Sequence, residues 1–175
     1  MNIIPYRARQ FWFALHAKPL TSQQKTTTNR RLTPAQMALF TRMQTGEQRH
    51  SIRVLETLQK EGQTNPDLLV AALLHDIGKI RYPLRLWERV FVVLGKKFFP
   101  QRSQVWGQNP PRGLARAFVV AEQHPTWGAE LAQEAGTTPR AVSLIRRHQE
   151  KISAEHIHSR EDHLLEVLQA ADNLH

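Results

Sequence analysis

The chain contains a wholly apolar run, Leu68 to Leu74, that leads directly into the polar pair His75-Asp76. A helix formed by this run would be apolar on every side, so it must be surrounded by protein. The carboxylate at its end needs a cation or strong hydrogen-bond donors nearby, because burying it unpaired is costly. The sequence therefore predicts a central helix that ends in a buried histidine and a buried carboxylate.

Helix start and stop signals flank this run. Thr33-Pro34 combines an N-cap with proline at the first helical position, and Asn65-Pro66 repeats the combination. No segment alternates in the manner of a strand, so the predicted fold class is all-α in one domain. Helices are expected at about 34–43, 47–61, 66–74, 86–99, 113–123, 125–135, 139–150 and 160–173, with loops or linkers at 21–31, 101–112 and 151–159.

Composition narrows the classes of function. The chain has no cysteine, which excludes disulfides, thiolate metal sites and a cysteine nucleophile. Its formal charge of +9 favours an anionic partner, either a phosphorylated small molecule, nucleic acid or an acidic membrane surface, although a merely solvated basic surface fits equally well. The apolar run is too short to cross a membrane and the N-terminus lacks a signal-peptide pattern, so we expect a cytoplasmic protein.

Two regions are expected to lie outside the main core. Residues 1–32 read as an aromatic and basic segment followed by a polar linker, and residues 33–175 as the domain, with a basic insert at about 84–112. The N-terminal segment either packs as a helix on the domain or a second subunit, or binds nucleic acid or a bilayer, through Arg7, Arg9, Phe11, Trp12 and Phe13. The insert carries an apolar stripe expected to be core, with a lid over an anionic substrate as the alternative: Val90, Phe91, Leu94 and Phe98.

Six histidine and aspartate positions share a helix face with apolar residues or stand at an expected helix end, where they can point inward. They are His50, His75, Asp76, His124, His148 and Asp172. Ligands collected from several helices are typical of two-metal centres in bundle cores. Nitrogen and oxygen ligands without sulfur suit Mn, Fe, Co, Ni or Zn. Five other histidines are expected to face solvent: His16, His156, His158, His163 and His175.

These motifs resemble the HD-domain superfamily of metal-dependent phosphohydrolases. Residues 75–79, His-Asp-Ile-Gly-Lys, match the motif that names its HDIG group. His124-Pro125-Thr126-Trp127-Gly128 and the stretch 145–150 resemble the H-P-x-x-G and I-x-x-H-H-E segments of HD-GYP proteins, which belong to the binuclear branch. The chain departs from that pattern at Gln149, which replaces the second histidine, and it has no segment like D-G-x-G-Y-P. The resemblance therefore does not imply cyclic di-GMP as the substrate.

The resemblance implies an HD-domain helical bundle with a buried site for two divalent transition-metal ions. One ion would be held by His50, His75, Asp76 and Asp172. The second would be held by His124 and His148, with Asp76 bridging the pair. A hydroxide that bridges two such ions can attack phosphorus, so the implied reaction is hydrolysis of a phosphate mono- or diester, with nucleotides among the candidate substrates.

Three cations are candidate contacts for the anionic substrate. Lys79 resembles the family lysine that reaches a phosphate or the attacking water, and its spacing from Asp76 allows both to face one cleft. A simple role at a helix C-terminus remains equally open for it. Arg53 and Arg147, beside the ligand positions, are weaker candidates for phosphate contact.

Three alternative functions remain open. The same six-ligand framework resembles that of HD-fold di-iron oxygenases, which use O₂ in place of water attack. A non-catalytic regulatory module could also retain its metal ligands. The basic surface could serve nucleic-acid binding, which would show a steep dependence on salt.

Overall fold

The computed structural model describes residues 19–151 and 159–175, and within these ranges the chain forms helices and no strand. The predicted all-α fold is therefore confirmed. The elements are α2 (Ser22–Asn29), α3 (Pro34–Arg42), α4 (Thr45–Lys60), α5 (Pro66–Leu74), η1 (Ile77–Arg81), α6 (Leu86–Phe98), α7 (Pro100–Gly107), η2 (Gly113–Ala115), α8 (Arg116–Glu134), α9 (Pro139–Arg147) and α10 (Arg160–Asn173).

The capping signals in the sequence mark where helices begin. Thr33 and Gln36 form a reciprocal capping box at the start of α3, and the Asn65 side chain accepts hydrogen bonds from the first turn of α5. Ser159 caps α10 through the backbone N–H of Asp162. Local hydrogen bonding thus fixes the starts of three helices that surround the site.

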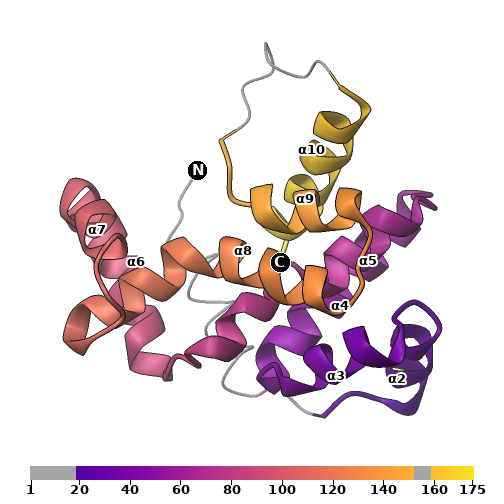
Figure 1. Ribbon diagram of the computed structural model, residues 1–175, viewed down its shortest axis with the longest axis horizontal. Helices are drawn as coiled ribbons and strands as arrows, with labels where there is room; N and C mark the ends of the chain where they lie inside the picture. Colours follow the sequence, from indigo (N-terminus) through magenta and orange to yellow (C-terminus); the bar gives the residue numbers. More distant parts are fainter. Residues whose placement is uncertain (1–18, 152–158) are drawn as a thin grey trace.

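The helix α5 lies at the centre of the main hydrophobic core. Six of its nine residues are buried, and α3, α4, α9 and α10 pack against it. These helices gather at one end of the molecule in Figure 1. The all-round apolar run therefore forms the central helix that it predicted.

The helices α6 and α7 form a second, smaller packing centre at the other end of the molecule (Figure 1). Phe118 of α8 is its central side chain, and the rings of Phe91 and Trp106 lie 5.3 and 5.0 Å from the Phe118 ring. The long helix α8 joins the two ends, because its first half packs here and its second half contributes Ala129 and Ala132 to the main core.

Two stretches expected to be loops or linkers are helical. Residues 21–31 contain α2, which begins with a capping box between Thr21 and Gln24 and buries Thr28. Residues 101–112 contain most of α7, which has Pro100 in its first turn. A Cβ at Gly107 would lie 2.9 Å from Cβ of Glu122, so only a small residue there lets α7 pack against α8. In both stretches, capping and tertiary packing outweigh the polar composition.

The expected break between helices at 123–125 is also absent. The helix α8 continues through Pro125, so His124 lies in a helix interior and not at a helix start. Interior proline costs about 3 kcal/mol because it removes a hydrogen bond and crowds the preceding turn. Packing of α8 against η1, α7 and α9 on several sides compensates for this cost.

The apolar stripe in the insert is only partly core. Val90 and Phe91 are partly buried, whereas Leu94 and Phe98 are exposed, because α6 turns a different face, with Val92 and Gly95, toward its neighbours. No helix among the described residues is long and apolar enough to cross a membrane. The N-terminal candidates Arg7, Arg9, Phe11, Trp12 and Phe13 lie outside the described residues, as do His16, His156 and His158.

Candidate metal centre

The six predicted ligand residues converge from five helices. His50 lies on α4, His75 and Asp76 follow the last turn of α5, and His124 lies on α8. His148 is the C-cap residue of α9, and Asp172 lies in the last turn of α10. Five of these side chains form two adjacent groups that could each hold a metal ion, and both groups contain Asp76. The sixth, Asp172, lies against His50 and His75 of the first group.

The first group is the more open of the two. His50 Nε2 lies 2.7 Å from Oδ1 of Asp172 and 3.3 Å from Nε2 of His75. His75 Nε2 is 3.6 Å from the same Asp172 oxygen. Burial would raise the pKa of Asp172, but His75 and the hydrogen bond from His50 hold that pKa far below its usual value. Asp172 is therefore an ionised carboxylate at the edge of the site.

The second group is fully buried. His124 Nε2 lies 3.2 Å from Oδ1 of Asp76 and 3.3 Å from Nε2 of His148. His148 Nε2 is 4.0 Å from the same Asp76 oxygen. Three potential ligand atoms thus surround one small volume that is closed to bulk solvent.

Asp76 lies between the groups and presents a different oxygen to each. Its Oδ1 faces His124 and His148, while its Oδ2 lies 3.7 Å from Nε2 of His75 and 2.7 Å from Nζ of Lys79. Burial acts to raise the pKa of Asp76, yet the Lys79 ammonium and the surrounding imidazoles hold it well below its usual range. An ionised carboxylate with two oppositely directed oxygens has the geometry of a bridging ligand.

Backbone carbonyls orient the three buried imidazoles. The Nδ1 atoms of His75, His124 and His148 lie 3.0, 2.9 and 2.7 Å from the carbonyl oxygens of residues 72, 120 and 145. A carbonyl can only accept, so each Nδ1 carries a proton, and in the neutral tautomer this leaves the Nε2 lone pair directed toward the centre. Such outer contacts fix the tautomer and the ring orientation of metal-binding histidines.

The donor set fits a cation. The Nε2 lone pairs of His124 and His148 face each other at 3.3 Å, an arrangement that is unfavourable unless a positive charge lies between or beside them. Protonating an imidazole is not an alternative at neutral pH, because burial lowers the pKa of both and brings that of His148 to about 3. The buried second group is therefore suited to a divalent transition metal.

A glycine allows the close approach of η1 to α8 beside the site. A Cβ on Gly78 of η1 would lie only 2.0 Å from the carbonyl oxygen of His124, and 2.7 Å from the backbone nitrogen of Gly128. Any larger residue at position 78 would push η1 and α8 apart. The glycine of the motif at 75–79 therefore lets His124 approach Asp76.

The sequence did not identify two further polar side chains at the site. Glu47 is buried on α4 and receives a 2.7 Å hydrogen bond from Arg89; burial raises its pKa despite the charges of Lys79 and Arg89. Its position one turn before His50 was an available signal. Gln149 places its Nε2 3.4 Å from Nε2 of His124, so the residue that departs from the family pattern lies at the rim of the second group.

The three candidate substrate contacts have different surroundings. Lys79 is partly exposed and contacts Asp76. Arg147 is engaged by three carboxylates, those of Glu150, Glu161 and Asp162, at 2.8–3.1 Å. Their hydrogen bonds raise the pKa of its guanidinium above the ordinary value. Contact of Arg147 with a substrate stays a prediction.

The remaining histidines also differ from one another. Arg53, the third candidate contact, is partly buried on α4. The burial of His175 and the positive charge of Arg53 lower the pKa of His175. His175 was expected to face solvent, but its Nε2 lies 2.7 Å from Oγ1 of Thr57 because α10 packs against α4. His163 is exposed, as predicted, and lies 3.6 Å from a carboxylate oxygen of Glu166.

The family model of the HD domain matches residues 48–175, which include all six converging residues. The chain belongs to the HD domain family. No curated protein and no solved structure gave a significant match to this chain. Membership in the HD domain family accords with the helical fold and with a metal-dependent, hydrolase-type function. The two groups of His and Asp side chains could bind metal ions.

Proposed function

We propose that this HD domain is a metal-dependent phosphohydrolase of the HDIG type with a binuclear centre. The observation that carries the proposal is the position of Asp76, whose two oxygens face separate groups of imidazoles. In this assignment His50, His75 and Asp172 complete one site, and His124 and His148 complete the other. Asp76 is the shared ligand.

Two bound divalent ions would supply an activated water and a positive clamp for phosphoryl oxygens. The chain itself supplies the fixed donors and excludes water from the inner group, where His124 and His148 are buried. The ionised state of Asp76 keeps a negative charge available for the ions at all physiological pH values. These features favour a preorganised centre, in which little rearrangement is needed on metal binding.

Lys79 is the proposed contact for the phosphate. Its Nζ is 2.7 Å from Asp76, yet its side chain is partly exposed, so it can reach both the carboxylate and an incoming anion. An ammonium at this position would stabilise the negative charge that develops on phosphoryl oxygens. Arg53 is a second candidate, because it lies on α4 one turn after His50.

The proposed substrate is a phosphate mono- or diester, with nucleotides as candidates. The domain proposed to bind it comprises residues 33–175. Gln149 at the rim of the second group argues against simple transfer of the cyclic di-GMP reaction from HD-GYP proteins. An amide there offers a neutral donor and acceptor where the family pattern has an imidazole.

Elemental analysis and a phosphoester panel test the proposal together. Protein purified without chelator should contain about two transition-metal ions per chain and, with Mn²⁺, should hydrolyse at least one phosphoester. Fewer than about one and a half ions after reconstitution would contradict the binuclear assignment. Oxygen consumption by the iron-loaded protein without phosphatase activity would favour a di-iron oxygenase, and full metal content without any turnover would favour a regulatory module.

A further inference from the structure

The helix α6 exposes three large apolar side chains. Trp87, Leu94 and Phe98 are 54%, 47% and 62% exposed, values that are high for large apolar side chains. Their spacings of seven and four residues put them on one side of the helix. We call these three residues the α6 stripe. The buried positions of α6 are Glu88, Val92 and Gly95, and the described residues leave about half of each stripe side chain uncovered.

Basic side chains stand at the C-terminal end of the stripe. Lys97 Nζ lies 5.4 Å from the Phe98 ring, which places a positive charge directly beside the apolar face. Lys96 precedes it in the last turn of α6, and Arg102 is exposed on α7. Phe99, between the two helices, is 53% exposed. Aromatic residues next to cations are typical of helices that lie in a membrane interface.

We propose that the α6 stripe binds the surface of an anionic lipid bilayer. In this arrangement the stripe enters the boundary between headgroups and acyl chains, and Lys97 and Arg102 contact lipid phosphates. The helix lies on the membrane, since no helix among the described residues could span it. The net charge of +9 adds a long-range attraction to the same surface.

The stripe is less suited to a second copy of the chain. Three half-exposed side chains of this size offer roughly 300–400 Å², whereas a stable interface buries about 800 Å² on each partner. A parallel pairing of two stripes would also bring Lys97 and its counterpart together, and like charges repel. A bilayer meets neither objection, because it is anionic and requires no complementary protein surface.

The position of α6 also allows this contact. In Figure 1, α6 and α7 lie at one end of the molecule, away from α5 and α9, whose C-terminal ends lead into His75-Asp76 and His148 of the candidate metal centre. Changing the exposed stripe should therefore leave the metal content and the hydrolytic activity intact. Membrane binding and the proposed hydrolysis can consequently be tested separately.

Vesicle flotation tests the proposal with the full chain. At low salt, the protein should float with vesicles of 30% phosphatidylglycerol in phosphatidylcholine and should stay unbound with phosphatidylcholine alone. The triple variant Trp87→Ser/Leu94→Ser/Phe98→Ser should lower the bound fraction by about tenfold or more, because the apolar contact is lost. Leu174→Ser, a residue of similar exposure at the end of α10, is the matched control and should bind as the wild type does.

Two double charge reversals distinguish attraction by the cations beside the stripe from attraction by the net charge of the chain. Lys97→Glu/Arg102→Glu should reduce flotation strongly, whereas Lys25→Glu/Lys60→Glu, with the same change in net charge on α2 and α4, should reduce it much less. Circular dichroism and metal content check that each variant is folded.

Four results would overturn the proposal. These are wild-type protein that does not float, equal binding to neutral vesicles, a stripe variant that binds normally, and a wild-type dimer in light scattering that the stripe variant converts to a monomer.

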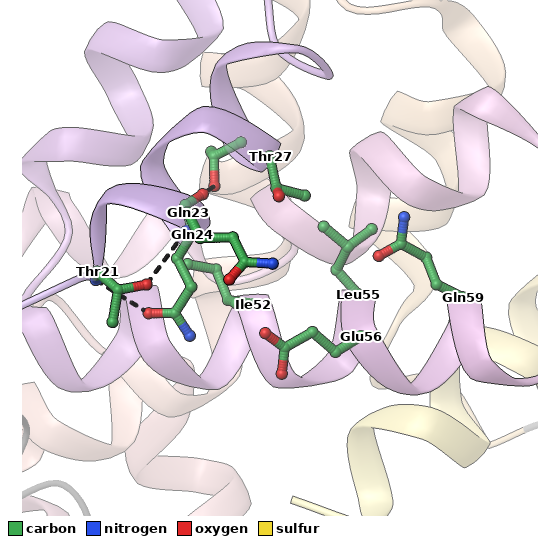
Figure 2. A pocket seen from close by; sticks show the side chains of 9 residues that line it. Thr21, Gln23, Gln24, Thr27, Ile52, Leu55, Glu56 and Gln59 are labelled. Carbon is green, nitrogen blue, oxygen red and sulfur yellow. Dashed lines mark hydrogen bonds between the residues drawn. The ribbon is translucent and has the colours of Figure 1, made fainter.

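A separate pocket on the described surface is lined mainly by neutral polar side chains. Figure 2 shows a pocket between α2 and α4 lined by Thr21, Gln24, Ile52 and Glu56 among others. Its polar groups are mainly neutral amides and hydroxyls, and two of them already bond to each other, since Thr21 and Gln24 form the capping box of α2.

Discussion

The ammonium of Lys79 lies 2.7 Å from Oδ2 of Asp76, the carboxylate shared by both candidate metal groups. If Lys79 acts on the phosphate, Lys79→Met should lower kcat by about 10²–10³-fold, the loss typical for one stabilising donor. The metal content should stay close to that of the wild type, because no ligand atom is removed. Steady-state kinetics with elemental analysis check this. Unchanged kcat would assign Lys79 to the helix end alone.

Asp76→Ala should remove both metals and the activity, since Asp76 is the only residue present in both groups. Asp172→Ala is the matched comparison, because the Asp172 carboxylate lies against His50 and His75 of the first group, and this variant should lose about one ion per chain. Metal analysis after desalting distinguishes the two. An Asp76→Ala protein with its full metal content would show that the proposed bridging arrangement is wrong.

Gly78→Ala should separate η1 from α8, because the added Cβ would meet the His124 carbonyl oxygen at 2.0 Å. We expect a loss of about 1–3 kcal/mol in the free energy of unfolding, together with weakened binding of the metal at His124 and His148. Gly62→Ala is the control, since a Cβ there meets nothing within 4 Å and only its positive φ of 77° is strained. Denaturant titration and metal analysis should show metal loss in the first variant alone.

Acid should destabilise the metal-free protein through His148. The unfolded imidazole takes up a proton below about pH 6.5, whereas burial holds the folded pKa at about 3. Stability is therefore fully present above pH 6.5 and falls as the pH drops toward 3, with a slope of up to about 1.4 kcal/mol per pH unit. Urea unfolding of chelator-treated protein at pH 7, 6 and 5 measures the slope. His148→Gln should flatten it, and an unchanged slope would count against this origin.

Arg147→Met distinguishes a structural from a substrate-binding role. The guanidinium joins Glu150 of the loop after α9 to Glu161 and Asp162 of α10, so its loss should lower the melting temperature by about 2–4 °C. The Michaelis constant for the phosphoester should change little. A rise of tenfold or more at an unchanged melting temperature would instead place Arg147 on the substrate.

Much of the fold followed from short-range signals. The apolar run at 68–74 and the caps at Thr33, Asn65 and Ser159 predicted helices that the structure contains, because these signals act within one turn of the chain. The helices α2 and α7 were missed, since their polar composition resembles a loop. The box of Thr21 and Gln24 was a readable signal for α2, whereas the fit of Gly107 against Glu122 depends on tertiary contact.

The residues of the candidate site could be proposed from their type and motif order, whereas their geometry could not. The six positions were chosen from helix faces and motif order, and the structure brings all six together. The placement of His124 was wrong because Pro125 suggested a helix start, while packing carries α8 through the proline. The separate directions of the two Asp76 oxygens and the close approach of Gly78 depend on how η1 meets α8, and no local pattern encodes that crossing.

The path of α8 through both packing centres has a mechanical consequence. Its 19 residues make a rod of about 28 Å, with Phe118 held by α6 and α7 near one end and His124 close to the middle. Gly78 of η1 packs against α8 beside His124 and leaves no free space there. One continuous helix therefore joins the packing around Phe118 to the position of His124. A substitution that repacks the buried side of α6 or α7 against Phe118 should consequently affect the helix that holds a candidate metal ligand.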